Sequence, residues 1–154
     1  MEVERKLEQM GLSLRASQTP LANYVMSVRT GNLLYVAGHG PVKDDGSTLY
    51  PGKLGREVTV EQGYEAARLT MLNCLSSTKT ALGDLDKVKR VVKLLCMVNS
   101  ADGFGEQPQV ANGASDLLVE LYGDRGRHAR SAVGMGGLPM NICVEIEMIL
   151  EVDD

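Results

Sequence analysis

The chain has 154 residues, and its 16 Lys and Arg against 20 Asp and Glu give a net charge of −4. Hydrophobic residues make up 44% and charged residues 23% of the sequence, a balance that excludes a disordered chain and fits a single domain over residues 1–154. One Phe, five Tyr and no Trp leave few platforms for stacking bases, and together with the acidic balance this argues against a nucleic-acid partner.

The N-terminal part predicts a short helix and then a β-hairpin. Apolar residues recur at helical spacing up to Met10, and Gly11 follows as a helix stop, so residues 1–20 are expected to form a helical extension. Two β-like runs, Asn23–Arg29 and Leu33–Ala37, flank a Thr-Gly-Asn turn signal, which is typical of a hairpin.

The middle of the chain predicts a long helix after a loop. The stretch Lys43–Gly55 is rich in Gly and Pro and is expected to be a loop. Thr59 and Gln62 have the spacing of a capping box, in which each side chain accepts a hydrogen bond from the backbone N–H of the other residue. The apolar stripe continues to about Leu82, and Gly83 follows as the helix stop.

The C-terminal half predicts three strands and a second helix. Val88–Val98 is rich in Val and Leu and is typical of a largely buried strand. Pro108 suits the first turn of a helix whose apolar face continues until Gly123. Further strands are expected near Arg130–Gly134 and over Ile142–Val152, where apolar and polar residues alternate.

The predicted order ββαβαββ indicates an α+β fold, a mixed sheet with both long helices packed on one face. The central strand Val88–Val98 is apolar on both sides, so an open second face would expose a larger apolar patch than monomers tolerate. We therefore expect another subunit to cover that face.

The expected location is cytoplasmic. No apolar run approaches the roughly 18 residues that cross a bilayer, and the first residues do not resemble a signal peptide. We therefore expect no membrane partner. Cys74, Cys96 and Cys143 lack metal-ligand spacing and lie in apolar stretches, so we expect them to be buried, reduced thiols.

The segment before the last strand contains the most informative polar residues. If the last two strands form a hairpin around the intervening Gly-rich loop, Arg130 lies opposite Glu145 and Ala132 opposite Cys143, all on one sheet face. A guanidinium there could bind a substrate carboxylate, and Glu145 could orient or deprotonate an attacking water. The alternative is a plain cross-strand salt bridge on a solvated face, contributing only about 0.2–1 kcal/mol.

The same segment resembles the C-terminal signature of the RidA/YjgF family of reactive intermediate deaminases, also named "endoribonuclease L-PSP". The pattern R-S-x-V-x-x-x-x-L-P over Arg130–Pro139 is followed by V-E-I-E over Val144–Glu147. Upstream, Asn23-Tyr24-Val25 and Gly38-His39-Gly40-Pro41 are similar to family motifs, and Asn112 is similar in position to a family asparagine near the pocket.

The resemblance extends over roughly Leu21–Val152 and implies a chorismate-mutase-like fold and a homotrimer with clefts between subunits. It implies hydrolysis of reactive enamine or imine intermediates to 2-oxo acids and ammonia, with a small carboxylated imine, enamine or 2-oxo acid as partner. It implies no metal and no organic cofactor.

The resemblance also implies roles for particular residues. Arg130 would anchor the substrate carboxylate, Glu145 would position the attacking water, and Tyr24 would help to wall the cleft. The other residues that it places at the substrate site are Gly38, His39, Asn112 and Ala132.

Departures from the family pattern indicate a divergent branch. Ala132 replaces a cysteine, Ala37 replaces a small hydroxyl residue, and His39 replaces a glutamine. The lost thiol leaves a second hypothesis open, a non-catalytic trimeric protein that binds a small carboxylated metabolite. The ribonuclease that the older name suggests finds no support in an acidic, aromatic-poor chain.

Several residues have two interpretations. His39 is either a proton carrier in the cleft or a turn residue. His128 is expected in a solvated link, in which Arg125 or Arg127 could supply a second binding cation. Glu147 alternates to the same face as Glu145, so one pKa could rise, or the two charges could simply repel each other in water.

Overall fold

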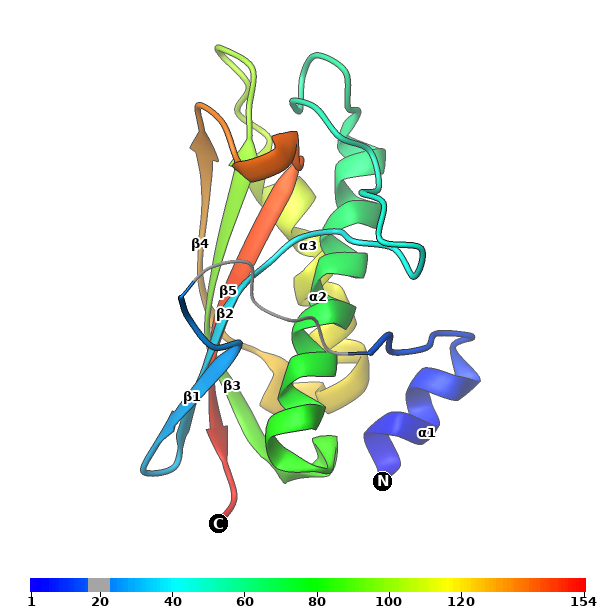
Figure 1. The fold of residues 1–154 in the computed structure, drawn as a ribbon, viewed down its shortest axis with the longest axis vertical. Coiled ribbons are helices and arrows are strands. Elements are labelled where there is room, and N and C mark those ends of the chain that lie inside the picture. Colours follow the sequence, from blue (N-terminus) through cyan, green and yellow to red (C-terminus); the bar gives the residue numbers. More distant parts are fainter. Residues whose placement is uncertain (17–22) are drawn as a thin grey trace.

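The computed structural model describes residues 1–16 and 23–154 and shows two layers, a five-stranded sheet and a pair of long helices on one of its faces (Figure 1). The expected extension over residues 1–20 and the start of the resemblance at Leu21 lie partly outside the described residues. The elements are α1 (Glu2–Gln9), β1 (Ser27–Thr30), β2 (Leu33–His39), α2 (Val60–Leu82), β3 (Val88–Asn99), α3 (Gln107–Tyr122), β4 (Ala129–Met135) and β5 (Val144–Val152).

The sheet has the strand order β1-β2-β5-β3-β4. β4 runs parallel to β3, and the other neighbours are antiparallel. The mixed sheet and the order ββαβαββ are therefore confirmed, but the expected hairpin between the last two strands is wrong. Helix α3 carries the chain across the sheet so that β4 lies parallel at the edge, and β5 then returns between β2 and β3.

The last strand also begins two residues later than expected, at Val144. Before it, Pro139–Asn141 forms a 3-10 turn in which Met140 and Asn141 have left-handed backbone angles, with φ of 56° and 58°. Extended pairing cannot pass through that conformation.

The predicted ends of the long helix α2 are confirmed. The Thr59 hydroxyl accepts from the Gln62 N–H at 3.2 Å, and the Gln62 side chain accepts from the Thr59 N–H at 3.0 Å. Gly83 ends the helix with a left-handed φ of 82°. Helices α2 and α3 approach closely at Gly113 of α3. A Cβ added there would overlap the backbone carbonyl of Tyr64 in α2.

Helix α1 is confirmed and packs beside α3, on the side of the helix layer away from the sheet (Figure 1). Its buried residues are Val3 and Leu7. Its first turn is held by Asp86, whose carboxylate accepts from the backbone N–H groups of Glu2 at 2.6 Å and Val3 at 2.8 Å. An anion suits the positive end of a helix dipole.

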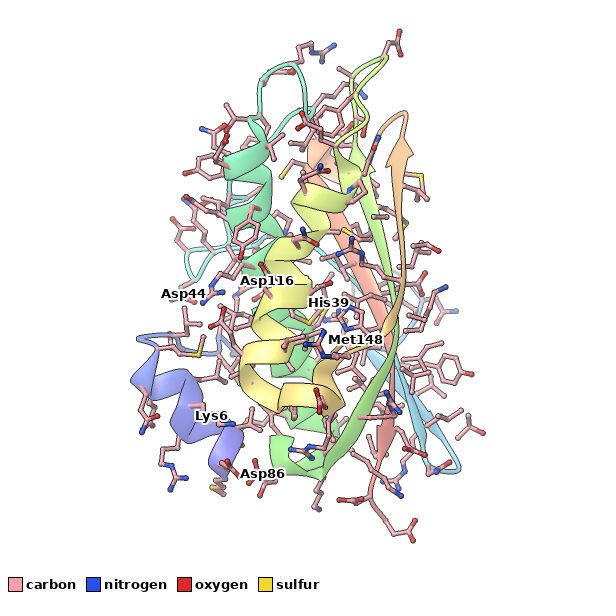
Figure 2. All side chains as sticks on the ribbon, turned by 180° about the vertical axis from the view of Figure 1, so that it is seen from behind. Lys6, His39, Asp44, Asp86, Asp116 and Met148 are labelled. Atoms are coloured by element: carbon pink, nitrogen blue, oxygen red, sulfur yellow. The ribbon has the colours of Figure 1, made fainter. Side chains whose placement is uncertain are left out.

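The core lies between the helices and the sheet. Alternate residues of β5, from Val144 to Val152, are buried there, and Figure 2 shows Met148 and His39 in this layer. All three cysteines are buried and unbridged, as expected. In the part of the chain that the structure describes, no helix is long and apolar enough to cross a membrane.

In the described parts of the chain, no helix covers the opposite face of the sheet (Figure 1). Val28 and Tyr35 are 55% and 44% exposed, and Val133 is 38% exposed. Leu95 and Met97 in β3 are only partly covered. The expected apolar open face is thus present in the single chain.

Candidate active site

The two residues expected to carry the chemistry lie on opposite faces of the sheet. Arg130 in β4 pairs with Leu94, whose side chain is buried under the helices. Glu145 in β5 pairs with Met97, on the open face. Because paired residues project to the same side of a sheet, the prediction that Arg130 and Glu145 share a face is wrong. The prediction assumed that β4 and β5 pair directly, but β3 lies between them and sets a different register for each.

Arg130 is held by helix α3. Its Nη1 donates to Asn112 Oδ1 at 2.9 Å and to Ser115 Oγ at 3.1 Å, and its Nη2 donates to the Pro108 carbonyl at 3.4 Å. A guanidinium has one N–H on Nε and two on each terminal nitrogen. The two hydrogen bonds to Asn112 and Ser115 therefore use both hydrogens of Nη1. Among the described residues, Nε has no hydrogen-bond partner, which leaves the edge formed by Nε and Nη2 for a carboxylate. The structure thus joins the predicted residues Arg130 and Asn112.

A hollow of about 280 Å³ opens beside Arg130 between α3 and β4. Figure 2 shows Asp116 on α3, and the lining residues are Ser115, Asp116, Val119, Arg127, His128 and Arg130. Of the two expected second cations, Arg127 lines this hollow. Arg125 instead donates to the Val88 carbonyl at 3.0 Å and lies 5.4 Å from the Tyr122 ring.

The expectation that His128 lies in a solvated link is wrong. Its side chain is partly buried, with Nε2 2.8 Å from Ser115 Oγ and Nδ1 2.6 Å from the Gly126 carbonyl. Burial lowers the pKa of His128, and the nearby charge of Arg130 lowers it further, against the opposite effect of the Gly126 hydrogen bond. The ring therefore belongs to the surroundings of Arg130.

Glu145 lies over a glycine on the open face. A Cβ added at Gly38 would overlap its carboxylate oxygen, so only glycine leaves room for Glu145 in this position. Burial raises the pKa of the Glu145 carboxyl, and the negative charge of Glu147 raises it further. The direction of this shift agrees with the first interpretation of the pair, in which one pKa rises. A carboxyl group with a raised pKa is a stronger base than an ordinary carboxylate, which suits it to accept a proton.

His39 faces the helices and not the open face. It is 5% exposed, with Nδ1 2.5 Å from the Ala37 carbonyl and Nε2 2.8 Å from Ser77 Oγ in α2. An irregularity in pairing between Val36 and His39 turns the side chain to that side, whereas simple alternation would have placed it opposite. His39 thereby ties β2 to α2 and supports the position of Gly38.

The remaining predicted residues are placed as follows. Ala132 packs against the core and pairs with Cys96 in β3. That thiol does not replace the family cysteine, because it is fully buried and burial raises its pKa to about 12. Tyr24 is 46% exposed, at the start of the second described range.

Ser115 and His128 were missed as neighbours of Arg130, although the sequence carried a signal for both. Ser115 lies three residues after Asn112 and so on the same helix face. His128 lies two residues before Arg130, the spacing of side chains on one sheet face. Neither signal points to a contact until α3 is known to pack on β4.

Three comparisons place the chain among known proteins. A sequence model described as "YjgF/chorismate mutase-like, putative endoribonuclease" matches residues 4–152. Protein TCP17 of Trypanosoma cruzi is 45% identical over 153 residues, 99% of this chain and 95% of that protein. The crystal structure of Atu1372 from Agrobacterium tumefaciens, a protein with unknown function, is also 45% identical. It has a TM-score of 0.92 over 98% of this chain and 92% of that one.

RidA from an Antarctic Psychrobacter bacterium is a more distant structural neighbour. It is 23% identical, with a TM-score of 0.62 over 88% of this chain and 94% of that chain. Identity this low supports the shared fold alone.

Proposed function

The chain belongs to the YjgF/chorismate mutase-like family, and from that premise we propose that it hydrolyses small reactive imines or enamines that carry a carboxylate. The products are a 2-oxo acid and ammonia. The observation that carries the proposal is the Nε and Nη2 edge of Arg130, where among the described residues Nε has no hydrogen-bond partner and Nη2 makes one long hydrogen bond of 3.4 Å to the Pro108 carbonyl. A guanidinium edge binds a carboxylate through two parallel hydrogen bonds.

The two halves of the proposed site meet between copies of the chain. One half is Arg130 with Asn112 beside α3, and the other is Glu145 over Gly38 on the open face. The sheet itself lies between these halves within one chain. Since the open face exposes the apolar side chains of Val28, Tyr35 and Val133, it can pack on a second copy and bring the two halves together. The proposed assembly is a homotrimer with a cleft at each interface.

In the proposed reaction Arg130 fixes the substrate carboxylate, and Glu145 of a neighbouring copy handles protons. The water oxygen bonds to the iminium carbon while Glu145 takes the proton that water loses and the C=N electron pair moves to nitrogen. Glu145 then gives that proton to nitrogen. As the C–N bond breaks, ammonia leaves, the C=O bond forms, and the hydroxyl proton passes to Glu145. The raised pKa of Glu145 suits both directions of transfer.

RNA cleavage, which the family description mentions, is less well supported by these side chains. Both ring nitrogens of His39 and of His128 hydrogen bond within the chain, so neither ring is free to act as a base. The net charge of −4 also opposes the approach of a polyanion.

Ala132 favours a second candidate, a non-catalytic protein that binds a small carboxylated metabolite in the same clefts. Alanine at this position removes the thiol that a RidA-type pocket would present. This candidate predicts that 2-oxo acids raise the melting temperature while freshly generated 2-iminobutanoate is not consumed faster than in buffer.

The test of the proposed function compares wild type with Arg130→Ala on freshly generated imines, following 2-oxo acid and ammonia. Losing the charged anchor should lower kcat/KM by about a hundredfold, while secondary structure and assembly persist. Arg68→Ala is the matched control, because this arginine pairs with Glu120 at 3.5 Å on the helix layer. Full activity in Arg130→Ala would overturn the proposal.

A further inference from the structure

A chain of hydrogen bonds runs from Arg130 to the backbone before β4. Arg130 Nη1 lies 3.1 Å from Ser115 Oγ, Ser115 Oγ lies 2.8 Å from His128 Nε2, and His128 Nδ1 lies 2.6 Å from the Gly126 carbonyl. Ser115 and His128 are both partly buried. The proposed reaction gives neither of them a step of its own.

Donor and acceptor roles along this chain are determined by its two ends. A guanidinium only donates, so Ser115 Oγ accepts from Arg130 and has one hydrogen left to give. A carbonyl only accepts, so His128 Nδ1 carries the ring hydrogen that points to Gly126. Nε2 then accepts from the Ser115 hydroxyl. One neutral tautomer of His128, with hydrogen on Nδ1, satisfies every group.

The surroundings keep this tautomer neutral. Burial and the charge of Arg130 both lower the pKa of His128, although the Gly126 hydrogen bond raises it. The other charged groups that line the hollow are Arg127 and Asp116, which are of opposite sign. His128 therefore acts as a hydrogen-bond acceptor near neutral pH.

We infer that Ser115 and His128 are positioning residues for the carboxylate anchor. They hold the Nη1 side of Arg130 against α3, so that the Nε and Nη2 edge is already oriented when substrate arrives. Orienting this long side chain beforehand removes part of the entropy lost on binding. The inference rests on the proposed role of Arg130 and deepens it.

The first test is spectroscopic and needs no activity. Nitrogen-15 NMR of the imidazole rings at pH 7 should show His128 neutral with its hydrogen on Nδ1, and His128→Gln assigns its signals against those of His39. In Ser115→Ala, the preference for this tautomer should weaken, because Nε2 loses its donor. A cationic His128 ring, or hydrogen on Nε2 in the wild type, overturns the inference.

The second test separates positioning from general stability. Ser115→Ala and His128→Leu should raise KM for the imine, and Kd for a 2-oxo acid, about three- to tenfold with little change in kcat. His128→Gln should restore affinity, since its side-chain oxygen can accept from Ser115. Tyr64→Phe is the matched control, because it removes a 2.8 Å hydrogen bond to Asp116 beside the same hollow. Unchanged affinities, or equal losses in the Leu and Gln variants, overturn the inference.

The two tests also distinguish failure of the inference from failure of the proposed function. If wild type binds 2-oxo acids without consuming imines and Ser115→Ala weakens that binding, the reaction is overturned and the positioning role is supported. If wild type neither binds 2-oxo acids nor consumes imines, both are overturned.

Discussion

At the scale of single residues, the position of Glu145 depends on the absence of a side chain at Gly38. A methyl group there would overlap the carboxylate, and Glu145 must move to admit it. Gly38→Ala should therefore lower kcat about 10- to 100-fold, because a small displacement of a reacting group has a large effect on rate. Steady-state kinetics on imines measure this effect. Gly136→Ala is the control, since an added Cβ meets nothing within 4 Å there. Equal kcat in all three proteins would contradict this account.

The pH dependence of the reaction should report the interaction between Glu145 and Glu147. Glu145 must be ionised to accept a proton, so activity falls as pH falls through its raised pKa. Glu147→Gln removes a negative charge that raises this pKa, and the acid limb of kcat should move to lower pH. Rate profiles of the two proteins between pH 4 and 8 test this, and an acid limb that does not move would show that Glu145 is not the group observed.

At the scale of elements, helix α3 is the support for the anchor. Gly113 allows α3 to lie against the Tyr64 carbonyl in α2, while Asn112 and Ser115 on α3 bind Arg130. Gly113→Ala forces the helices apart and should lower the free energy of unfolding by about 1–3 kcal/mol. It should also raise KM, because Arg130 loses its fixed orientation. Urea unfolding and imine kinetics measure the two effects, with Gly105→Ala, where an added Cβ meets nothing, as the control. Lower stability with an unchanged KM would contradict the proposal that α3 orients Arg130.

The elements themselves were largely predictable from the sequence, but one strand pairing was not. The capping box at Thr59 and Gln62, and Gly83 and Gly123 as stops, bounded the helices because these signals are local. Pairing is not local. Period-2 alternation in β4 fits any neighbour, and only the crossover through α3 decides that β4 lies beside β3 and not beside β5.

The sequence nominates residues for the candidate site, but it does not predict how they are arranged. The motif singled out Arg130 and Glu145 as candidates, but the strand pairing places them on opposite faces of the sheet. The side to which His39 points is likewise not readable from alternation, because one irregularity in β2 turns its side chain toward the helices.

At the scale of the whole molecule, the open sheet face should hold the copies together. Leu95 lies on this face opposite Glu147 in β5. Leu95→Arg should leave a folded chain, because Glu147 can pair with the new charge, but it should prevent assembly and abolish imine hydrolysis. Light scattering should give three chain masses for wild type and one for the variant. Ala81→Arg, on the exposed side of α2, is the control. A monomeric wild type would contradict the proposed homotrimer.

The central claim is that each site takes Arg130 from one copy and Glu145 from another. Arg130→Ala and Glu145→Gln should each be inactive alone. Co-expressed, they should form mixed trimers with about a third of wild-type activity, since one of the three interfaces in each mixed trimer joins an intact Arg130 to an intact Glu145. Imine hydrolysis by the purified mixed trimers measures this directly. Mixed trimers with no activity would contradict the account, because a site built within one chain cannot be restored by mixing.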